Sequence, residues 1–259
     1  MIQKSALVFL AILFSLSLFL SPVSASHKGG SDNSKIPEEN GTYDDPGHPG
    51  VKVRVFVHRE KPQTSSPPLL VCGLADPDST AVVSPAGWHL PSSVTYSLNP
   101  SSVPSSVGGV NLPTIAVNGF GDWNGAVGGK VTFTRGSDTI VTRTAYDGRN
   151  IIAWGRTSGS ALGVTYVRYF SQTGLVVDVD TIMNKKFPWK WSNSTTCADS
   201  NYYDAENILN HELGHWIGLD DHYTTEYQHN TMYGYGSKGE VKKNTLTVGD
   251  NSGAAAIYP

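Results

Sequence analysis

The segment His211-Glu212-Leu213-Gly214-His215 carries the strongest chemical signal in the sequence. On a helix, histidines four residues apart lie on one face, so both imidazoles can reach one metal ion. Glu212 directly follows the first histidine, which puts its carboxylate beside such a metal, where a general base can take a proton from water. The same pattern also occurs by chance on exposed helices, so the flanking residues decide between the two interpretations.

The flanking residues predict how this helix begins and ends. Asp204 is expected to cap its N-terminus, and the helix is expected to run to Ile217. Gly218 can adopt positive φ, which lets the chain leave the helix and turn back. Asp221 lies six residues after His215, where the returning chain could deliver a third ligand.

The sequence from His211 to Asp221, followed by Met232 in the turn Asn230–Gly236, resembles the metzincin clan of zinc metallopeptidases. Within the clan it is most similar to matrixin-like and snapalysin-like secreted microbial peptidases. The resemblance implies an α+β fold: a twisted, mostly parallel sheet with an antiparallel edge strand, packed on a long zinc-binding helix, with a C-terminal helix. It also implies that Met232 packs beneath the metal as an apolar floor. The similarity covers about residues 87–259 and includes Trp88–Asn99, Val131–Thr134, Asp178–Asp180 and Gly249–Tyr258.

The third ligand departs from the commonest metzincin pattern. Most members have histidine where this chain has Asp221, and the snapalysin-like pattern has aspartate there. A carboxylate is an acceptable zinc ligand, so we expect Asp221. His222 would need the loop to bulge by one residue, and Asp220 is the remaining alternative. A thermolysin-like site is disfavoured, because Glu226 and Glu240 lie in segments without the second helix that it requires.

These residues predict a secreted zinc endopeptidase in which Glu212 is the general base. Several metzincins place a tyrosine just after the methionine, so Tyr233 and Tyr235 are candidates for the oxyanion site or the wall of the specificity pocket. The clan pairs extended substrate with an exposed edge strand, which we expect at Leu162–Tyr169. The alternative is a non-catalytic secreted zinc-containing binding or adhesion module on a metzincin scaffold. Glu212 argues against it, because a structural metal site needs no base.

The N-terminal region indicates export. Residues 1–25 combine a lysine, an apolar run and a small-residue cleavage site after Ala25, which is typical of a secretory signal peptide. Residues 26–86 are expected to be an N-terminal extension, a propeptide or linker that is partly disordered. Residues 87–259 are expected to form the catalytic domain.

The charge balance limits the partners. Lys and Arg number 19 against 22 Asp and Glu, for a formal net charge of -3. Nothing in this balance indicates nucleic acid or an anionic membrane as a partner. We expect a monomer that acts on a protein or peptide substrate.

Cys72 and Cys197 are the two cysteines of the chain, and an oxidising compartment favours their pairing in a disulfide. The alternative comes from the resemblance. Residues Cys72–Asp76 are similar to the matrixin propeptide switch, in which a cysteine thiolate occupies the open zinc position. The preceding Leu70–Val71 departs from that pattern, in which Pro-Arg stands there.

Aspartates suggest a second metal. Asp178 and Asp180 alternate on a predicted strand and, with loop aspartates at Asp76, Asp78 and Asp122, could bind Ca²⁺. The alternative is a solvated strand face with turn caps.

His48, His58 and His89 have no metal-ligand spacing and are expected to be ordinary loop or surface residues. Trp189, Trp191 and Phe187 are expected to serve packing rather than ligand contacts.

Hydrophobic patterning predicts the remaining elements. Strands are expected over residues 51–58, 93–98, 130–134 and 139–144, with a hairpin of 162–170 and 175–183, a helix over 113–123, and a last helix with a capping box from Thr247 to Asp250.

Overall fold

The computed structural model describes residues 36–61 and 69–259 of this mixed α+β protein. Its centre is an eight-stranded sheet in the order β1-β2-β7-β8-β6-β4-β5, with β12 also paired to β2. The strands of this sheet are β1 (Gly41–Asp44), β2 (Val51–Glu60), β4 (Ser93–Leu98), β5 (Thr132–Arg135), β6 (Asn150–Gly155), β7 (Ala161–Phe170), β8 (Val176–Asn184) and β12 (Tyr235–Gly236). The predicted signal peptide, residues 1–25, lies outside the described residues.

Within the described residues, three α-helices accompany the sheet: α1 (Leu112–Ala126), α2 (Ala205–Ile217) and α3 (Val248–Ile257). Two small sheets pair β3 (Leu70–Cys72) with β10 (Cys197–Asp199), and β9 (Trp189–Lys190) with β11 (Tyr203–Asp204). Among the described residues, no helix has both the length and the apolar character needed to cross a membrane.

Apart from the short parallel pairing of β12 with β2, the main sheet is parallel in one half and antiparallel in the other. β5, β4, β6 and β8 run parallel to their neighbours, whereas β8, β7, β2 and β1 are joined by antiparallel pairing. The predicted β7–β8 hairpin is confirmed. The predicted exposed edge at Leu162–Tyr169 is wrong, because β2 pairs along the outer side of β7 from Val51 to Arg59.

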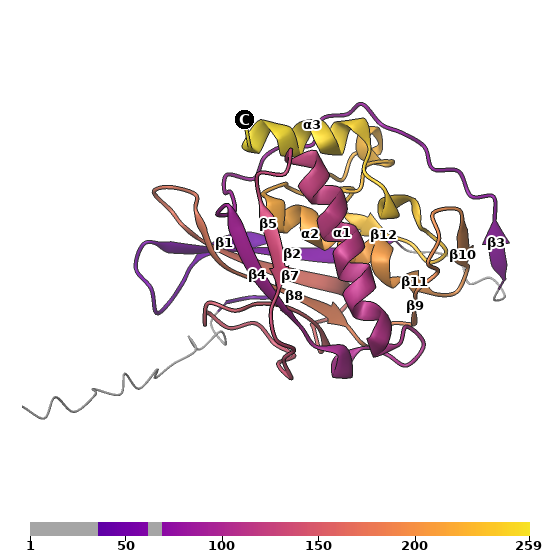
Figure 1. The fold of residues 1–259 in the computed structure, drawn as a ribbon, viewed down its shortest axis with the longest axis horizontal. Coiled ribbons are helices and arrows are strands. Elements are labelled where there is room, and N and C mark those ends of the chain that lie inside the picture. The colour runs from indigo at the N-terminus through magenta and orange to yellow at the C-terminus, as the bar shows by residue number, and fades with distance from the viewer. Residues whose placement is uncertain (1–35, 62–68) are drawn as a thin grey trace, which may run out of the picture.

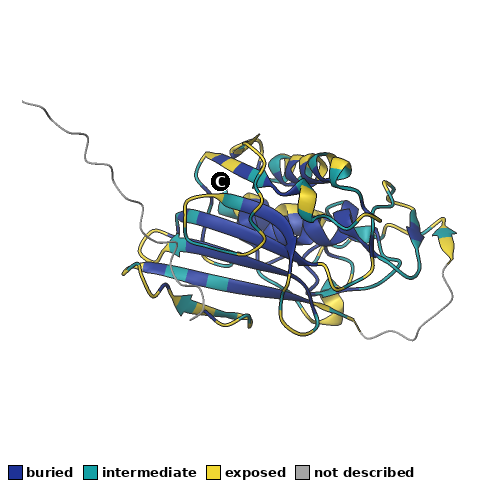
Figure 2. Cartoon of the chain, turned by 90° about the horizontal axis from the view of Figure 1, so that it is seen from below, coloured by how far each residue is buried: buried dark blue, intermediate teal, exposed yellow. Residues whose placement is uncertain are grey.

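The sheet buries side chains on both faces. On one face, α1, α2 and α3 close the main hydrophobic core, in which Trp123, Trp154 and Trp216 are fully buried (Figure 1). On the other face, alternate valines of β2 pack with Ala161, Val164 and other residues of β7. Figure 2 shows the long central strands as buried along most of their length. β2 is therefore part of the packed body, although it lies within the segment expected to be an extension.

The helix ends follow the sequence signals. Asp204 accepts hydrogen bonds from the backbone N–H groups of Glu206 and Asn207, and Gly218 ends α2 with φ of 118°. Thr247 and Asp250 form the predicted capping box of α3. These predictions are confirmed, and the signals at Asp204 and Gly218 set the two ends of α2.

One strand was misplaced by the pattern. Residues 139–144 form a loop in which Val141 covers Ile151, Ala153 and Ile182. The strand lies instead at β6, where Ile151 to Gly155 are all buried. A strand buried on both faces shows no polar–apolar alternation, which is why the pattern missed it.

Candidate metal centre

Helix α2 carries the candidate site, and all of its residues are buried. Met232 lies directly against the helix at Gly214: a Cβ atom built there would come 2.2 Å from the Met232 sulfur. The glycine between the two histidines is therefore needed for the close approach of Met232 to α2. Met232 itself is fully buried, in the place of an apolar floor to this part of the helix.

Three side-chain atoms converge at one point. Asp221 Oδ1 lies 3.2 Å from His211 Nε2 and 3.5 Å from His215 Nε2. All three atoms are buried and make no hydrogen bond that meets full geometric criteria. Ligand atoms about 2.0–2.1 Å from a tetrahedral metal are about 3.3–3.4 Å apart, so the spacing suits a metal ion. These residues therefore form a group that could hold one.

Backbone carbonyls orient the two imidazoles. His211 Nδ1 lies 2.7 Å from the carbonyl oxygen of Thr231, and His215 Nδ1 lies 2.9 Å from that of Leu219. A carbonyl only accepts, so each Nδ1 carries the proton and each Nε2 presents a lone pair to the common point. This is the outer-shell arrangement typical of metal-bound histidine.

The charges suit metal binding as well. Burial, with repulsion by Lys243, lowers the pKa of His211 to about 3, so this imidazole is neutral. Burial acts to raise the pKa of Asp221, but electrostatic attraction to His215 and the close contact of both imidazoles hold it well below its ordinary value. Tyr223 donates a hydrogen bond of 2.9 Å to Asp221 Oδ2, which leaves Oδ1 facing the histidines.

Glu212 lies beside this group and is held by a chain of hydroxyls. Thr165 donates to Glu212 Oε2 at 2.5 Å, Thr181 lies 2.7 Å from Thr165, and Trp216 Nε1 donates to Thr181. Burial raises the pKa of Glu212 to about 7. A carboxyl with this pKa exchanges protons near neutral pH, as a general base must.

Strand β7 accommodates Glu212 through a glycine. A Cβ atom on Gly163 would lie 2.6 Å from Glu212 Oε1. The absence of a side chain at this position lets the carboxylate approach the strand closely.

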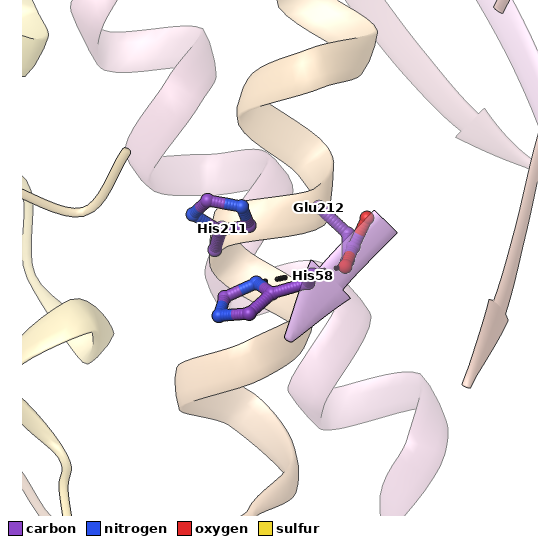
Figure 3. A group of neighbouring side chains, drawn as sticks. All are labelled: His58, His211 and Glu212. Atoms are coloured by element: carbon purple, nitrogen blue, oxygen red, sulfur yellow. Dashed lines mark ion pairs between the residues drawn. The ribbon is translucent and has the colours of Figure 1, made fainter. Parts of the chain in front are cut away.

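His58 is the main correction to the sequence analysis. It was expected at the surface or in a loop, but it is fully buried on β2, with its ring centroid 3.9 Å from that of His211. Its Nδ1 lies 3.6 Å from Glu212 Oε1 (Figure 3). Spacing along the sequence could not reveal this contact, because β2 and α2 meet only through the sheet.

Lys243 is a second residue that the sequence analysis missed. Its Nζ is fully buried and donates to the carbonyl oxygens of Tyr233 at 2.5 Å and Tyr235 at 3.1 Å. It lies 3.3 Å from His58 Nε2, which must then accept, so His58 Nδ1 carries the proton that faces Glu212. Burial lowers the pKa of Lys243 to about 8, which leaves it mostly charged at neutral pH.

The other predicted residues lie outside the converging group. His222 Nε2 accepts from the backbone of Ser84 and its ring stacks on Tyr227, while Asp220 pairs with Arg54 at 3.0 Å. Of the three alternatives for the third ligand, the structure brings only Asp221 to the histidines.

Tyr233 and Tyr235 follow Met232 and pack against each other, with ring centroids 5.6 Å apart. Their backbone carbonyls face Lys243, and a role for either side chain at an oxyanion stays a prediction. The tyrosine hydroxyl that does contact the group belongs to Tyr223, two residues after Asp221.

Asp178 and Asp180 are neither solvated nor arranged around an open cation site. Both are buried, and Arg168 lies between them, with Nη1 2.8 Å from Asp178 Oδ1 and 3.5 Å from Asp180 Oδ2. Backbone N–H groups of the loop 145–148 donate to the same carboxylates. Asp122, expected in a loop, lies within helix α1. Calcium binding stays a prediction that these contacts do not favour.

Cys72 and Cys197 form the predicted disulfide and join β3 to β10. Cys72 therefore offers no thiolate to the candidate site, and the cysteine-switch alternative is wrong for this form of the chain. Trp189 is buried in the core, as expected of a packing residue.

Comparison with models of known protein families gives no match, and neither does comparison with curated protein sequences. The interpretation of the site therefore rests on its own residues and their geometry.

Proposed function

We propose that this protein is a secreted zinc-dependent endopeptidase of metzincin type. The observation that carries the proposal is the convergence of His211 Nε2, His215 Nε2 and Asp221 Oδ1 next to the buried carboxylate of Glu212. Three protein ligands with a base beside them are typical of a catalytic zinc site, whereas a structural site normally has four ligands. The signal peptide predicted at residues 1–25 and the disulfide are consistent with an extracellular protein.

The strand order also supports a metzincin type. Strands β5, β4, β6 and β8 run parallel, the antiparallel β7 follows, and α2 packs behind them. The Met232 turn lies against Gly214 of α2. These features agree with the fold that the sequence resemblance implies.

When bound at this site, zinc would supply Lewis acidity for a peptide carbonyl and lower the pKa of a water molecule to about 7. Glu212 takes one proton from the attacking water and later delivers it to the amine nitrogen of the leaving peptide. The Thr165 hydroxyl holds Glu212 Oε2, so Oε1 is the atom available for this transfer. The products are a carboxylic acid and an amine, so the atoms of one water are accounted for.

One observation favours a second candidate, a non-catalytic secreted module with a metal in its core. His211, Glu212 and His215 are fully buried, as in structural metal sites. Glu212 weighs against this candidate. A buried carboxyl with a pKa raised to about 7 lowers the stability of the fold at neutral pH, and a structural metal site has no use for it.

The test is cleavage of casein by zinc-loaded protein, with Glu212→Gln and Glu226→Gln compared under the same conditions. Glu226 lies exposed on the short turn Thr225–Tyr227, so its variant controls for the loss of one carboxylate. We expect Glu212→Gln to keep zinc and lose about 10²–10⁴-fold in rate, as for removal of a general base. The Glu226 variant should match the wild type. Equal rates in all three proteins would remove Glu212 from the mechanism.

A further inference from the structure

Strand β2 lies over the candidate site. It pairs antiparallel with β7 on the side that faces away from β8, and its last two residues pair with β12. β7 therefore has neighbours along both sides, and no edge of it is open to a peptide. Extended peptides commonly bind proteins by adding a strand to such an edge.

Two side chains of β2 point at the site. The ring of Phe56 stacks on the ring of His215, with centroids 3.6 Å apart and planes inclined by 7°. Two residues further on, His58 contacts His211 and Glu212. Alternate residues of a strand face the same side, so both point toward α2 while Val55 and Val57 face the opposite cluster.

The His58 side chain is fully buried, and Lys243 bounds the space that it fills, which we call its side-chain pocket. Lys243 Nζ lies 3.3 Å from His58 Nε2. A Cβ atom on Gly236 would lie 3.1 Å from the same nitrogen, so Gly236 leaves room for the ring. The pocket thus suits a side chain that accepts a hydrogen bond at its tip.

We propose that residues 36–61 are an intramolecular ligand of the candidate site: β2 occupies the peptide-binding edge of β7, His58 occupies its side-chain pocket, and both must leave before a substrate can bind. This inference rests on the proposed peptidase function and adds its regulation. It explains how residues with the chemistry of a hydrolase can be fully buried. It also assigns Lys243 to the recognition of a substrate side chain with an acceptor group, such as a carboxylate.

Two zinc-loaded proteins test the proposal, each with an inserted recognition sequence for a specific protease. In one, the insertion lies between Lys61 and Leu69, so that cutting separates residues 36–61 from the rest. In the other, it lies before Ile36, so that cutting leaves β1 and β2 attached. The second protein is the matched control for the insertion and the protease.

Two readouts separate this inference from the proposed function. The first is the rate at which a chelator removes zinc, which needs no peptidase activity. The second is casein cleavage. If about 1% of the intact chains are open, release of the fragment should raise both rates about 100-fold. The control should show no change in either rate.

The outcomes differ for the two proposals. Faster zinc removal without casein cleavage would support β2 as the occupant and count against the peptidase. If casein is cleaved at the same rate before and after residues 36–61 are released, the peptidase proposal is supported and this inference is overturned. A fragment that cannot be separated without unfolding the protein would also overturn it, because β2 would then be a permanent strand.

Adding the synthetic peptide 36–61 back to the released protein tests the side-chain contacts. The peptide should restore slow zinc removal, and Phe56→Ala or His58→Ala should weaken its binding about tenfold or more. Lys52→Ala is the control, since Lys52 pairs with Asp44 inside the same peptide. If the His58→Ala peptide binds as tightly as the control, the assignment of the pocket is wrong.

Discussion

Two of the buried polar clusters in the described part of the chain differ in how their charges are satisfied. In the acidic cluster, Arg168 lies among the carboxylates of Asp45, Asp178 and Asp180, with ion pairs of 2.8–3.5 Å. In the metal cluster, His211, His215 and Asp221 direct their lone pairs at one common point. The first cluster contains its own cation and holds the sheet together. The second has the donor set and spacing for a cation supplied from outside.

The largest expected effect comes from removing the internal cation. Arg168→Met leaves three buried carboxylates without their counter-charge and should lower the free energy of unfolding by about 3–5 kcal/mol. Urea denaturation measures the loss. Arg149→Met is the control, because Arg149 is largely exposed in its pair with Asp147 and should change stability by less than about 1 kcal/mol. A small loss in Arg168→Met would mean that the two clusters do not differ as described.

Glu212→Gln should stabilise the metal-free protein at high pH. The pKa of Glu212 is raised to about 7, so its contribution to stability is present below its unfolded pKa and is lost as the pH rises through about 7. The variant has no carboxyl to ionise here, so it does not lose this stability. At pH 8 its free energy of unfolding should exceed that of the wild type by at most about 3 kcal/mol. At pH 4 the variant and the wild type should have the same free energy of unfolding. Melting temperatures from pH 4 to 8 measure the difference, and parallel curves would contradict it.

Zinc should stabilise the protein through the metal cluster alone. At a free concentration of 100 times Kd, binding adds about 2.7 kcal/mol to the free energy of unfolding. His211→Ala should abolish this gain, whereas Arg168→Met should keep it despite its lower baseline. Thermal unfolding of each variant, with zinc and with a chelator, measures the gain in stability. A gain that persists in His211→Ala would place the ion elsewhere.

The smallest expected effect is at the outer shell. Tyr223→Phe removes the hydroxyl that donates to Asp221 Oδ2 and should weaken zinc binding about tenfold, or about 1.4 kcal/mol. Tyr227→Phe is the matched control, since its hydroxyl is not bonded to the metal cluster. Competition with a chromophoric chelator gives both affinities. Equal affinities would show that the Tyr223 hydroxyl does not help Asp221 to bind the metal.

Local signals predicted the helix of the site well. The cap at Asp204, the stop at Gly218 and the ligand spacing from His211 to Asp221 all act within one stretch of chain. The contacts that sequence reasoning missed join distant segments. His58 and Lys243 are 185 residues apart, and only the pairing of β2 in the sheet brings them together. Neither residue has a short-range pattern that marks it as part of a site.

The polar composition of the segments around β2 also prevented a correct prediction of where this strand packs. Its alternating valines predicted a strand, but the polar stretches around it suggested an extension apart from the main body. The predicted strand at 139–144 failed for a related reason, because Val141 packs on the sheet as part of a loop. Burial can come from a covering loop as well as from strand pairing, and residue type does not separate the two.

Asp250 has a consequence for the order in which this protein is assembled. The carboxylate that caps α3 also accepts hydrogen bonds from the backbone N–H groups of Thr231 and Met232, and Thr231 holds His211 through its carbonyl. The support beneath the first histidine is therefore complete only when α3 has been synthesised and docked. Metal uptake at this site should be a late event in biogenesis, after translation has passed residue 257 and, for an exported chain, after translocation.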